Sequence, residues 1–248
     1  MPVLTRIDPV PPGDPHPRRI WYLSYGSNTH PDRLARYIGG GRTPGAVGDC
    51  PGCRDTRMPS RSLAVEPAGA VYFATESPVW GGGRAFYDPS AGGRALARAH
   101  LITAEQFSDI AAQEMYREPG PLLDLTEVLA RGRAVVGEGR YETLVCAGQV
   151  DGLPVLTFTA PWGVDDVTPV PPSAAYLRCL ASGLLSAGVW GTDTVAAHLA
   201  SCPGAAGHWS PAAVAGLLRE PRREGGGAAG DGVRSAEGDD PLPDRYRR

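Results

Sequence analysis

The chain has 248 residues, 42% of them hydrophobic, which is enough for one compact domain to bury a core and excludes a short disulfide scaffold. Its 33 glycines and 25 prolines exceed the usual share in a globular protein, so we expect many of them in loops and tails. All 24 basic residues are arginines against 27 acidic residues, and a net charge of -3 offers no basic field for nucleic acid, which is not expected as a partner.

Both ends of the chain are predicted to lie outside the folded domain. Residues 1–19 carry a run of prolines from Pro9 to Pro17, which lack N–H groups and have fixed φ angles, so we predict an arm that forms neither helix nor strand pairing. Residues 219–248 mix Gly, Pro, Asp and Arg with almost no large apolar side chain, which predicts a disordered Gly/Arg-rich tail. A single domain over residues 20–218 remains.

The domain is predicted to open with a strand, a tight loop and a helix. Residues 19–25 are aromatic and β-favouring, and this run ends at a Gly-Ser-Asn turn. A helix over 31–38 follows, because Pro31 suits the first turn and the apolar residues after it recur at helical spacing. After a stretch rich in Gly, Pro and Arg, the pattern predicts three short β-like runs with the spacing of a meander or a barrel wall, at 70–74, 84–87 and 97–102.

A capped helix and a hairpin are predicted in the second half. Thr103 and Gln106 fit a capping box, and apolar residues at helical spacing carry that helix to about Met115. Residues 116–140 indicate only a short helix around 125–130. The later pattern predicts a hairpin over 141–147 and 154–159 and helices over 172–187, 192–200 and 211–218. Because strands mostly precede helices, we predict an α+β fold, a small mixed β-barrel with packed helices.

Several motifs that often carry chemistry are incomplete in this sequence. Cys50 and Cys53 have the spacing of half a zinc site, but no second close Cys/His pair completes it, so we interpret both as ordinary thiols and expect no metal. The triplet at 81–83, Gly-Gly-Gly, lacks the other residues of a phosphate loop and the spacing of a dinucleotide fingerprint. By itself it indicates a close backbone approach or a bulge. No cofactor is expected.

Location and association are inferred from composition alone. Five cysteines are an odd number and no segment of the secretory type opens the chain, so we expect the reducing cytoplasm. No apolar run approaches the roughly 20 residues that cross a bilayer, so a membrane is not expected as a partner. We expect a monomer or a homodimer.

Two features remain as candidates for a functional site. The turn at 25–28 joins a strand directly to a helix, which leaves successive N–H groups pointing at one space, where they would bind a carboxylate or carbonyl oxygen. The alternative is a plain turn in which Ser27 or Asn28 caps the next helix. Glu114, near the end of a helix, is the second candidate, and its alternative is an ordinary solvated side chain.

The sequence resembles the gamma-glutamylcyclotransferase-like family over about residues 20–188. Residues 23–28, Leu-Ser-Tyr-Gly-Ser-Asn, are similar to the signature loop of that family. Further matches follow in the family's order. Residues 80–85, Trp-Gly-Gly-Gly-Arg-Ala, resemble its Trp-x-Gly-Gly-x-Ala strand, and Glu114 resembles its helix-borne catalytic Glu. Tyr141 resembles the tyrosine that opens the following strand, and Tyr176 ends a segment similar to the one before its late helix.

This resemblance implies a cyclotransferase that acts on a small-molecule γ-glutamyl or related amide substrate. The substrate's own α-amine attacks its γ-carbonyl and releases 5-oxoproline and an amine, so the enzyme mainly has to orient the substrate and move protons. Glu114 is implied as the catalytic proton carrier. The residues implied in substrate binding are Tyr25, Gly26, Ser27, Asn28, Gly82, Gly83, Tyr141 and Tyr176.

The sequence departs from this family around the catalytic Glu. The family's Leu-Asp-x-x-Glu-Gly stands here as Ile-Ala-Ala-Gln-Glu-Met over 110–115, and the segment 116–140 is longer than the family's link to the next strand. The leaving group therefore stays open. Two alternatives stay open as well. One is a non-catalytic binding module for a γ-glutamyl or carboxylate ligand, and the other is an acyltransferase or amidase in which an outside amine or water attacks.

Overall fold

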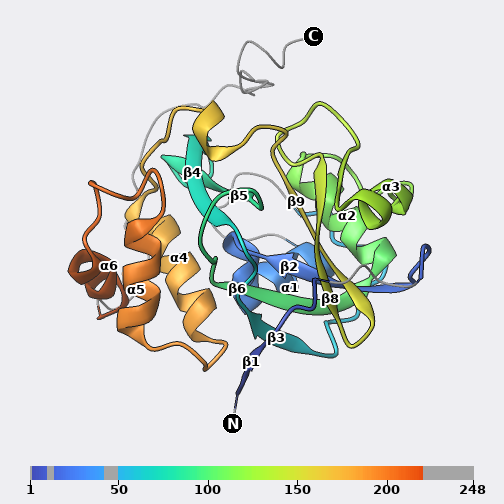
Figure 1. Cartoon of the computed structure of the whole chain (residues 1–248), viewed down its shortest axis with the longest axis horizontal. Helices are drawn as coiled ribbons and strands as arrows, with labels where there is room; N and C mark the ends of the chain where they lie inside the picture. The colour runs from blue at the N-terminus through green and yellow to red at the C-terminus, as the bar shows by residue number, and fades with distance from the viewer. Residues whose placement is uncertain (1, 10–13, 42–49, 220–248) are drawn as a thin grey trace.

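The protein is built on a mixed sheet with helices on both faces (Figure 1). The computed structural model describes residues 2–9, 14–41 and 50–219. The sheet has the strand order β1-β3-β6-β2-β9-β8-β7, in which β1 is parallel to β3, β2 is parallel to β9, and the other neighbours are antiparallel. Its strands are β1 (Leu4–Thr5), β2 (Arg19–Ser24), β3 (Ser62–Val65), β6 (Ala97–Thr103), β7 (Arg133–Val135), β8 (Thr143–Val150) and β9 (Leu153–Thr159).

Strand β2 is buried inside this sheet and contributes to two cores, because successive side chains of a strand point to opposite faces. Trp21 and Leu23 join a cluster that packs against α4 (Ala174–Leu185), α5 (Thr192–Ser201) and α6 (Pro211–Arg219). Ile20 and Tyr22 join a second cluster, packed against α1 (Pro31–Gly39), α2 (Ala104–Glu114) and α3 (Thr126–Arg131). Figure 1 shows these two helix groups on opposite sides of the sheet. Each of these helices was predicted, with ends that differ by one or two residues.

The predicted barrel is wrong, since the sheet is open among the described residues, with β1 and β7 at its edges. Strands β4 (Ala70–Glu76) and β5 (Gly83–Asp88) pair only with each other. The β4-β5 pair meets the larger sheet where β5 contacts β9 through a side chain. The Thr159 hydroxyl accepts from the Tyr87 N–H at 3.0 Å and donates to the Tyr87 carbonyl at 2.8 Å. The Thr159 side chain thus takes the place of backbone pairing and holds β5 beside β9 without a continuous ladder of hydrogen bonds.

The N-terminal segment also differs from the predicted arm, because part of it pairs with the sheet. Leu4 and Thr5 pair with Ala64 and Val65 of β3, and Asp8 forms a bridge with Gln149 of β8. These pairs precede Pro9, where the dense run of prolines begins. Arg219 ends α6, and the rest of the predicted tail lies outside the described residues. The domain boundaries at 20 and 218 stay a prediction. No described helix combines the length and apolar character that crossing a membrane requires.

Candidate functional site

The loop after β2 forms a single turn of 3-10 helix, η1 (Ser27–Thr29), before α1 begins. Thr29 and His30 donate their N–H groups to the carbonyls of Gly26 and Ser27. The N–H groups of Gly26, Ser27 and Asn28 donate to no acceptor within the described part of the chain. The strand, the loop and the helix follow the predicted order. The three N–H groups leave the loop with hydrogen-bond donors for a ligand.

Asn28 does not cap the following helix. The cap of α1 is His30, whose side chain accepts from the Asp32 N–H. The Asn28 amide is buried and donates instead to the Tyr22 hydroxyl at 3.2 Å and to Glu114 Oε1 at 3.1 Å. Asn28 is therefore not the helix cap, and the ligand-facing turn stays a prediction.

Glu114 is the last residue of α2 and lies beside this loop through its bond to Asn28. Burial raises the pKa of its carboxyl above the ordinary value. Hydrogen bonding from Tyr37, the positive charges of Arg33 and Arg140, and the bond from Asn28 act in the opposite direction. Glu114 is therefore a partly desolvated acid rather than a solvated surface carboxylate, which is the environment that suits proton transfer near neutral pH.

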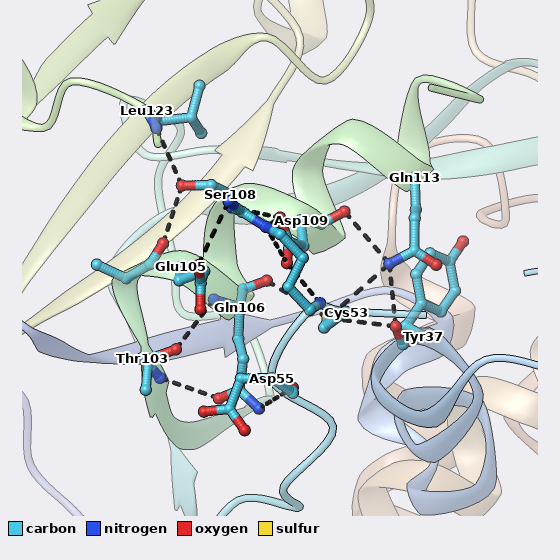
Figure 2. Close-up of polar contacts among 12 residues, drawn as sticks. Tyr37, Cys53, Asp55, Thr103, Glu105, Gln106, Ser108, Asp109, Gln113 and Leu123 are labelled. Carbon is cyan, nitrogen blue, oxygen red and sulfur yellow. Dashed lines mark hydrogen bonds and ion pairs between the residues drawn. The ribbon is translucent and has the colours of Figure 1, made fainter. Parts of the chain in front are cut away.

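A polar network fixes α2, and thereby Glu114, against the rest of the domain (Figure 2). The predicted capping box is confirmed, because Thr103 and Gln106 exchange the two expected hydrogen bonds at 3.0 Å. At the other end, Gln113 donates to the carbonyl of Tyr37 on α1 at 2.9 Å. The Cys53 thiol also donates to the Tyr37 carbonyl at 3.3 Å. Cys53 thus helps to join α2 to α1, and the described residues include no cluster of three or more His, Cys, Asp or Glu that could hold a metal ion.

The loop and Glu114 line a small cavity of about 40 Å³. Most of the predicted site residues meet there, and three lining residues were not predicted, namely Tyr22, Ala85 and Phe158. Tyr22 and Phe158 belong to the second core cluster, where their rings stack at 5.4 Å, so the sequence pattern identifies them only as core. The predicted residues that line the cavity are Tyr25, Gly26, Ser27, Asn28, Glu114, Tyr141 and Tyr176.

Tyr141 and Tyr176 both line the cavity and both bond Ala85 of β5. The Tyr141 hydroxyl donates to the Ala85 carbonyl at 2.9 Å, and the Tyr176 hydroxyl accepts from the Ala85 N–H at 3.3 Å. Burial raises the pKa of both phenols well above the ordinary value, so both stay neutral. The proton of Tyr176 has no acceptor among the described residues, which leaves it available to a ligand in the cavity.

Gly82 and Gly83 do not line this cavity. The Gly83 N–H donates to the Pro171 carbonyl at 2.8 Å, and a Cβ at Gly83 would lie 2.0 Å from the Val170 carbonyl oxygen. Gly82 has a φ of 99°, and a Cβ there would lie 2.5 Å from the Pro171 oxygen. Both residues therefore allow the close backbone approach that the Gly-Gly-Gly pattern predicted, here between the start of β5 and the segment leading to α4. Their role in substrate binding stays a prediction.

No model of a known protein family matches the sequence. A relative, "Histone deacetylase 5" of Arabidopsis thaliana, is 30% identical over 200 residues, which cover 73% of this chain, but the chain spans only 30% of the length of that protein. An uncharacterised protein from Homo sapiens aligns with a TM-score of 0.42 and 15% identity, covering 82% of this chain and all of that one.

A solved gamma-glutamyl cyclotransferase aligns with a TM-score of 0.33 and 15% identity, covering 68% of this chain and 80% of that one. At these TM-scores neither structural likeness assigns an activity to this chain. The case for a function therefore rests on the residues around the cavity.

Proposed function

We propose that this protein is a γ-glutamyl cyclotransferase with Glu114 as its proton carrier. The observation that carries the proposal is the 3.1 Å bond between Asn28 and Glu114, which joins a partly buried carboxyl of raised pKa to a loop with three available N–H groups. The resemblance of residues 23–28 to the signature loop of the gamma-glutamylcyclotransferase-like family supports it. The confirmed element order around the loop and α2 supports it as well.

The proposed reaction needs no nucleophile from the protein. The α-nitrogen of the γ-glutamyl group attacks its own γ-carbonyl carbon, and a new C–N bond closes a five-membered ring. The bond from that carbon to the leaving nitrogen then breaks. The ammonium loses two protons as its nitrogen becomes the ring N–H. One passes to the leaving nitrogen as its bond breaks, and the other ends on the released amine or in solvent, so the products are 5-oxoproline and an amine, and no water is consumed. Because the ring closure is intramolecular, holding the substrate in a folded conformation supplies much of the rate acceleration.

Glu114 would take the proton from the ammonium and deliver it to the leaving nitrogen. Desolvation makes its carboxylate a stronger base than a surface Glu, and the Asn28 amide holds one of its oxygens in place. The N–H groups of Gly26, Ser27 and Asn28 would bind the carbonyl oxygen as negative charge develops on it. The Tyr176 hydroxyl, which lies 3.5 Å from where a Cβ of Gly26 would be, is close enough to add a further donor there.

The test is a comparison of the wild type with Glu114→Gln on a panel of γ-glutamyl amines, amino acids and peptides, with 5-oxoproline followed by mass spectrometry. Loss of a positioned proton carrier costs about 10²- to 10⁴-fold, so the variant should lose at least 100-fold in rate. Glu105→Gln is the matched control, because Glu105 lies in the first turn of the same helix and pairs with Arg54 at 3.3 Å, away from the cavity.

Three other outcomes would contradict the proposal. Equal rates for the wild type and Glu114→Gln would exclude Glu114 as the proton carrier. Tight binding of a panel member without any product would favour the non-catalytic binding module. Release of glutamate in place of 5-oxoproline would show that water attacks, as in an amidase.

A further inference from the structure

One buried arginine of the sheet bonds the loop after β2. Arg98, on β6, pairs in register with Ser24, the last residue of β2, and is only 9% exposed. Its Nη1 donates to the carbonyl of Thr29 at 3.0 Å and to the Ser186 hydroxyl at 2.6 Å. Thr29 is the last residue of η1, and Ser186 caps the C-terminal end of α4. Arg98 therefore joins the loop to β6 and to α4.

The charge of Arg98 has no carboxylate partner within the part of the chain that the structure describes. Its hydrogen bonds go to two neutral oxygens, and its Nε is buried without a bond to any described residue. By contrast, Arg54, Arg117 and Arg131 each pair with an acidic side chain. Burial without a counter-charge is costly and lowers the pKa of Arg98, yet a guanidinium stays protonated. A neutral side chain could join β6 to α4 at lower cost, so the charge itself calls for an explanation.

A chain of hydrogen bonds leads from this charge to an available donor of the loop. Arg98 bonds the Thr29 carbonyl, and the other end of that peptide unit is the His30 N–H. The His30 N–H donates to the Ser27 carbonyl at 3.0 Å. The other end of this second peptide unit is the Asn28 N–H, which has no acceptor among the described residues. Two peptide units in series therefore separate the guanidinium from the Asn28 donor.

The same bonds fix the direction in which the donors of the loop point. A trans peptide unit is planar, so its N–H points opposite to its carbonyl. Because the Ser27 carbonyl is directed at His30, the Asn28 N–H is directed away from it. Thr29 acts in the same way on the preceding unit, since its N–H and its hydroxyl both donate to the Gly26 carbonyl, at 3.0 and 2.9 Å. The Ser27 N–H is thereby directed away from Thr29.

Helix α4 packs directly against this turn. A Cβ at Gly183 would lie 2.5 Å from the Thr29 hydroxyl oxygen and 2.6 Å from the His30 nitrogen, so only glycine allows α4 to approach this closely. Ser186, three residues further on, donates to the Gly183 carbonyl at 2.7 Å and accepts from Arg98. The turn is therefore held both by α4 and by the Arg98 side chain.

A fixed and polarised donor is what a developing negative charge requires. N–H groups stabilise such a charge best when they are already aimed at it, because no reorientation is then needed during the reaction. Hydrogen bonds in a chain polarise one another. A cation at the Thr29 carbonyl therefore makes the His30 N–H, and after it the Asn28 N–H, a stronger donor. This arrangement suits an oxyanion at the available end of the chain.

We propose that Arg98 is a positioning residue whose buried charge aims and strengthens the Asn28 N–H through the two peptide units between them. Arg98 does not line the cavity and acts on a substrate only through these units. The inference rests on the proposed function and deepens it, because it assigns a source to the electrostatic stabilisation of the substrate's carbonyl oxygen. It adds a residue of β6 to the groups that serve the reaction.

The kinetic test compares Arg98→Gln, which keeps a neutral donor, with Arg98→Lys, which keeps a charge. On the γ-glutamyl compound that the wild type turns over fastest, Arg98→Gln should lose at least about 10-fold in kcat with little change in KM, because the lost stabilisation acts mainly in the transition state. Arg98→Lys should retain more of the wild-type kcat.

Ser186→Ala is the matched control, because it removes the other bond of the same Nη1 and leaves the bond to Thr29. Its kcat should stay close to that of the wild type. A purely structural role predicts that Arg98→Gln is at least as active as Arg98→Lys, or that Ser186→Ala loses as much kcat as Arg98→Gln. Either result would overturn the proposal.

Backbone amide signals of nitrogen-15-labelled protein test the same chain of bonds without turnover. In Arg98→Gln the amide protons of Asn28 and His30 should move to higher field, because both donors become less polarised, while Ser186→Ala should leave them in place. If they move but the wild type forms no 5-oxoproline, positioning by Arg98 stands and cyclotransfer fails. If 5-oxoproline forms but the Asn28 amide does not move, cyclotransfer stands and this inference fails.

Arg98→Lys also guards against a variant that does not fold. Rates are referred to the folded fraction, measured by thermal unfolding. If Arg98→Gln fails to fold, Arg98→Lys is compared with the wild type by the same amide signals, and an unmoved Asn28 amide would overturn the proposal.

Discussion

Two carboxylates on α2, one fully buried and one partly buried, differ in how fully the protein satisfies them. The Asp109 side chain is completely buried, and Arg54 bonds it three times, from its backbone N–H at 2.9 Å, from Nε at 3.1 Å and from a terminal nitrogen at 2.8 Å. Charge-assisted and two-pronged bonds of this kind are among the strongest in proteins. Arg54 therefore supplies donors to both oxygens of the Asp109 carboxylate.

Glu114 lies five residues further along the same helix and is less well compensated. Tyr37 and Asn28 hydrogen-bond to it, Arg33 and Arg140 act on it through their charges, and burial still raises the pKa of its carboxyl. The difference teaches that burial of an acid does not by itself indicate chemistry. A structural acid has its partners in the chain, whereas Glu114 faces a cavity also lined by Asn28, whose buried Oδ1 has no partner among the described residues.

The largest effect on stability should come from breaking the structural pair with Asp109→Asn. Losing the charge of Asp109 leaves Arg54 with a neutral partner, and disrupting a buried ion pair costs about 3–5 kcal/mol. Because the Arg54 side chain is 42% exposed, we expect a loss below that range, about 2–3 kcal/mol. Urea unfolding measures this loss. The rate per folded molecule should stay within a few-fold of wild type, and a collapse of activity without a loss of stability would reverse the roles of the two acids.

A smaller loss should follow from Gln113→Ala, at the residue next to Glu114. Gln113 donates to the Tyr37 carbonyl at 2.9 Å and accepts from the Gly52 N–H at 3.3 Å, so its removal leaves backbone groups unsatisfied. We expect a decrease of about 1–2 kcal/mol in the free energy of unfolding. If α2 is held mainly by its apolar face, the decrease will be below about 0.5 kcal/mol, which thermal and urea unfolding would both reveal.

Glu114→Gln should stabilise the folded protein modestly, and only at higher pH. Burial raises the folded-state pKa of Glu114 above the ordinary 4.5, so the stabilisation from its protonated form is full below 4.5 and is lost as the pH rises through the folded value. Gln does not ionise and avoids this loss. The melting temperature of the variant relative to wild type should therefore increase from pH 4 to pH 8. A constant difference over that range would mean that Glu114 titrates normally.

The smallest expected effect is a shift in the pKa of Glu114 when Asn28 is replaced, because the Asn28 amide lowers that pKa. Asn28→Ala removes this donor, so the pKa of Glu114 should rise further, and the acidic limb of a pH profile should move to higher pH. Carbon-13 NMR of the labelled carboxyl follows this titration even where no substrate is turned over. A shift to lower pH would show that Asn28 contacts the protonated acid instead.

Local signals in the sequence predicted much of this architecture. The capping box at Thr103 and Gln106 fixed where α2 begins, and apolar spacing carried it to within one residue of its end at Glu114. The Gly-Ser-Asn turn between β-favouring and helical patterns placed the loop that lines the cavity. These features depend on residues that are neighbours in sequence, which is why a sequence pattern reveals them.

Other features depend on which distant segments meet. Strands β1, β3 and β7 have only two, four and three residues, too few to show an alternating pattern, and no local signal distinguishes an open sheet from a barrel. Arg33 was predicted only as part of a helix, and Arg140 lay in a segment without a clear pattern. Their convergence on Glu114 follows from the packing of α1 and of the segment before β8 around α2, and only the folded chain shows it.

Trp80 stacks on the cavity residue Tyr176 and has Arg33 beside its indole, so its intrinsic fluorescence can report on ligand binding. Indole emission responds to nearby charge and polarity. A ligand that moves Tyr176 or Arg33 relative to the indole should therefore change the fluorescence of Trp80 without any label. Subtracting the signal of a Trp80→Phe variant removes the contribution of the other four tryptophans. Occupancy of the cavity can therefore be followed on the millisecond scale of stopped-flow mixing, before any product accumulates.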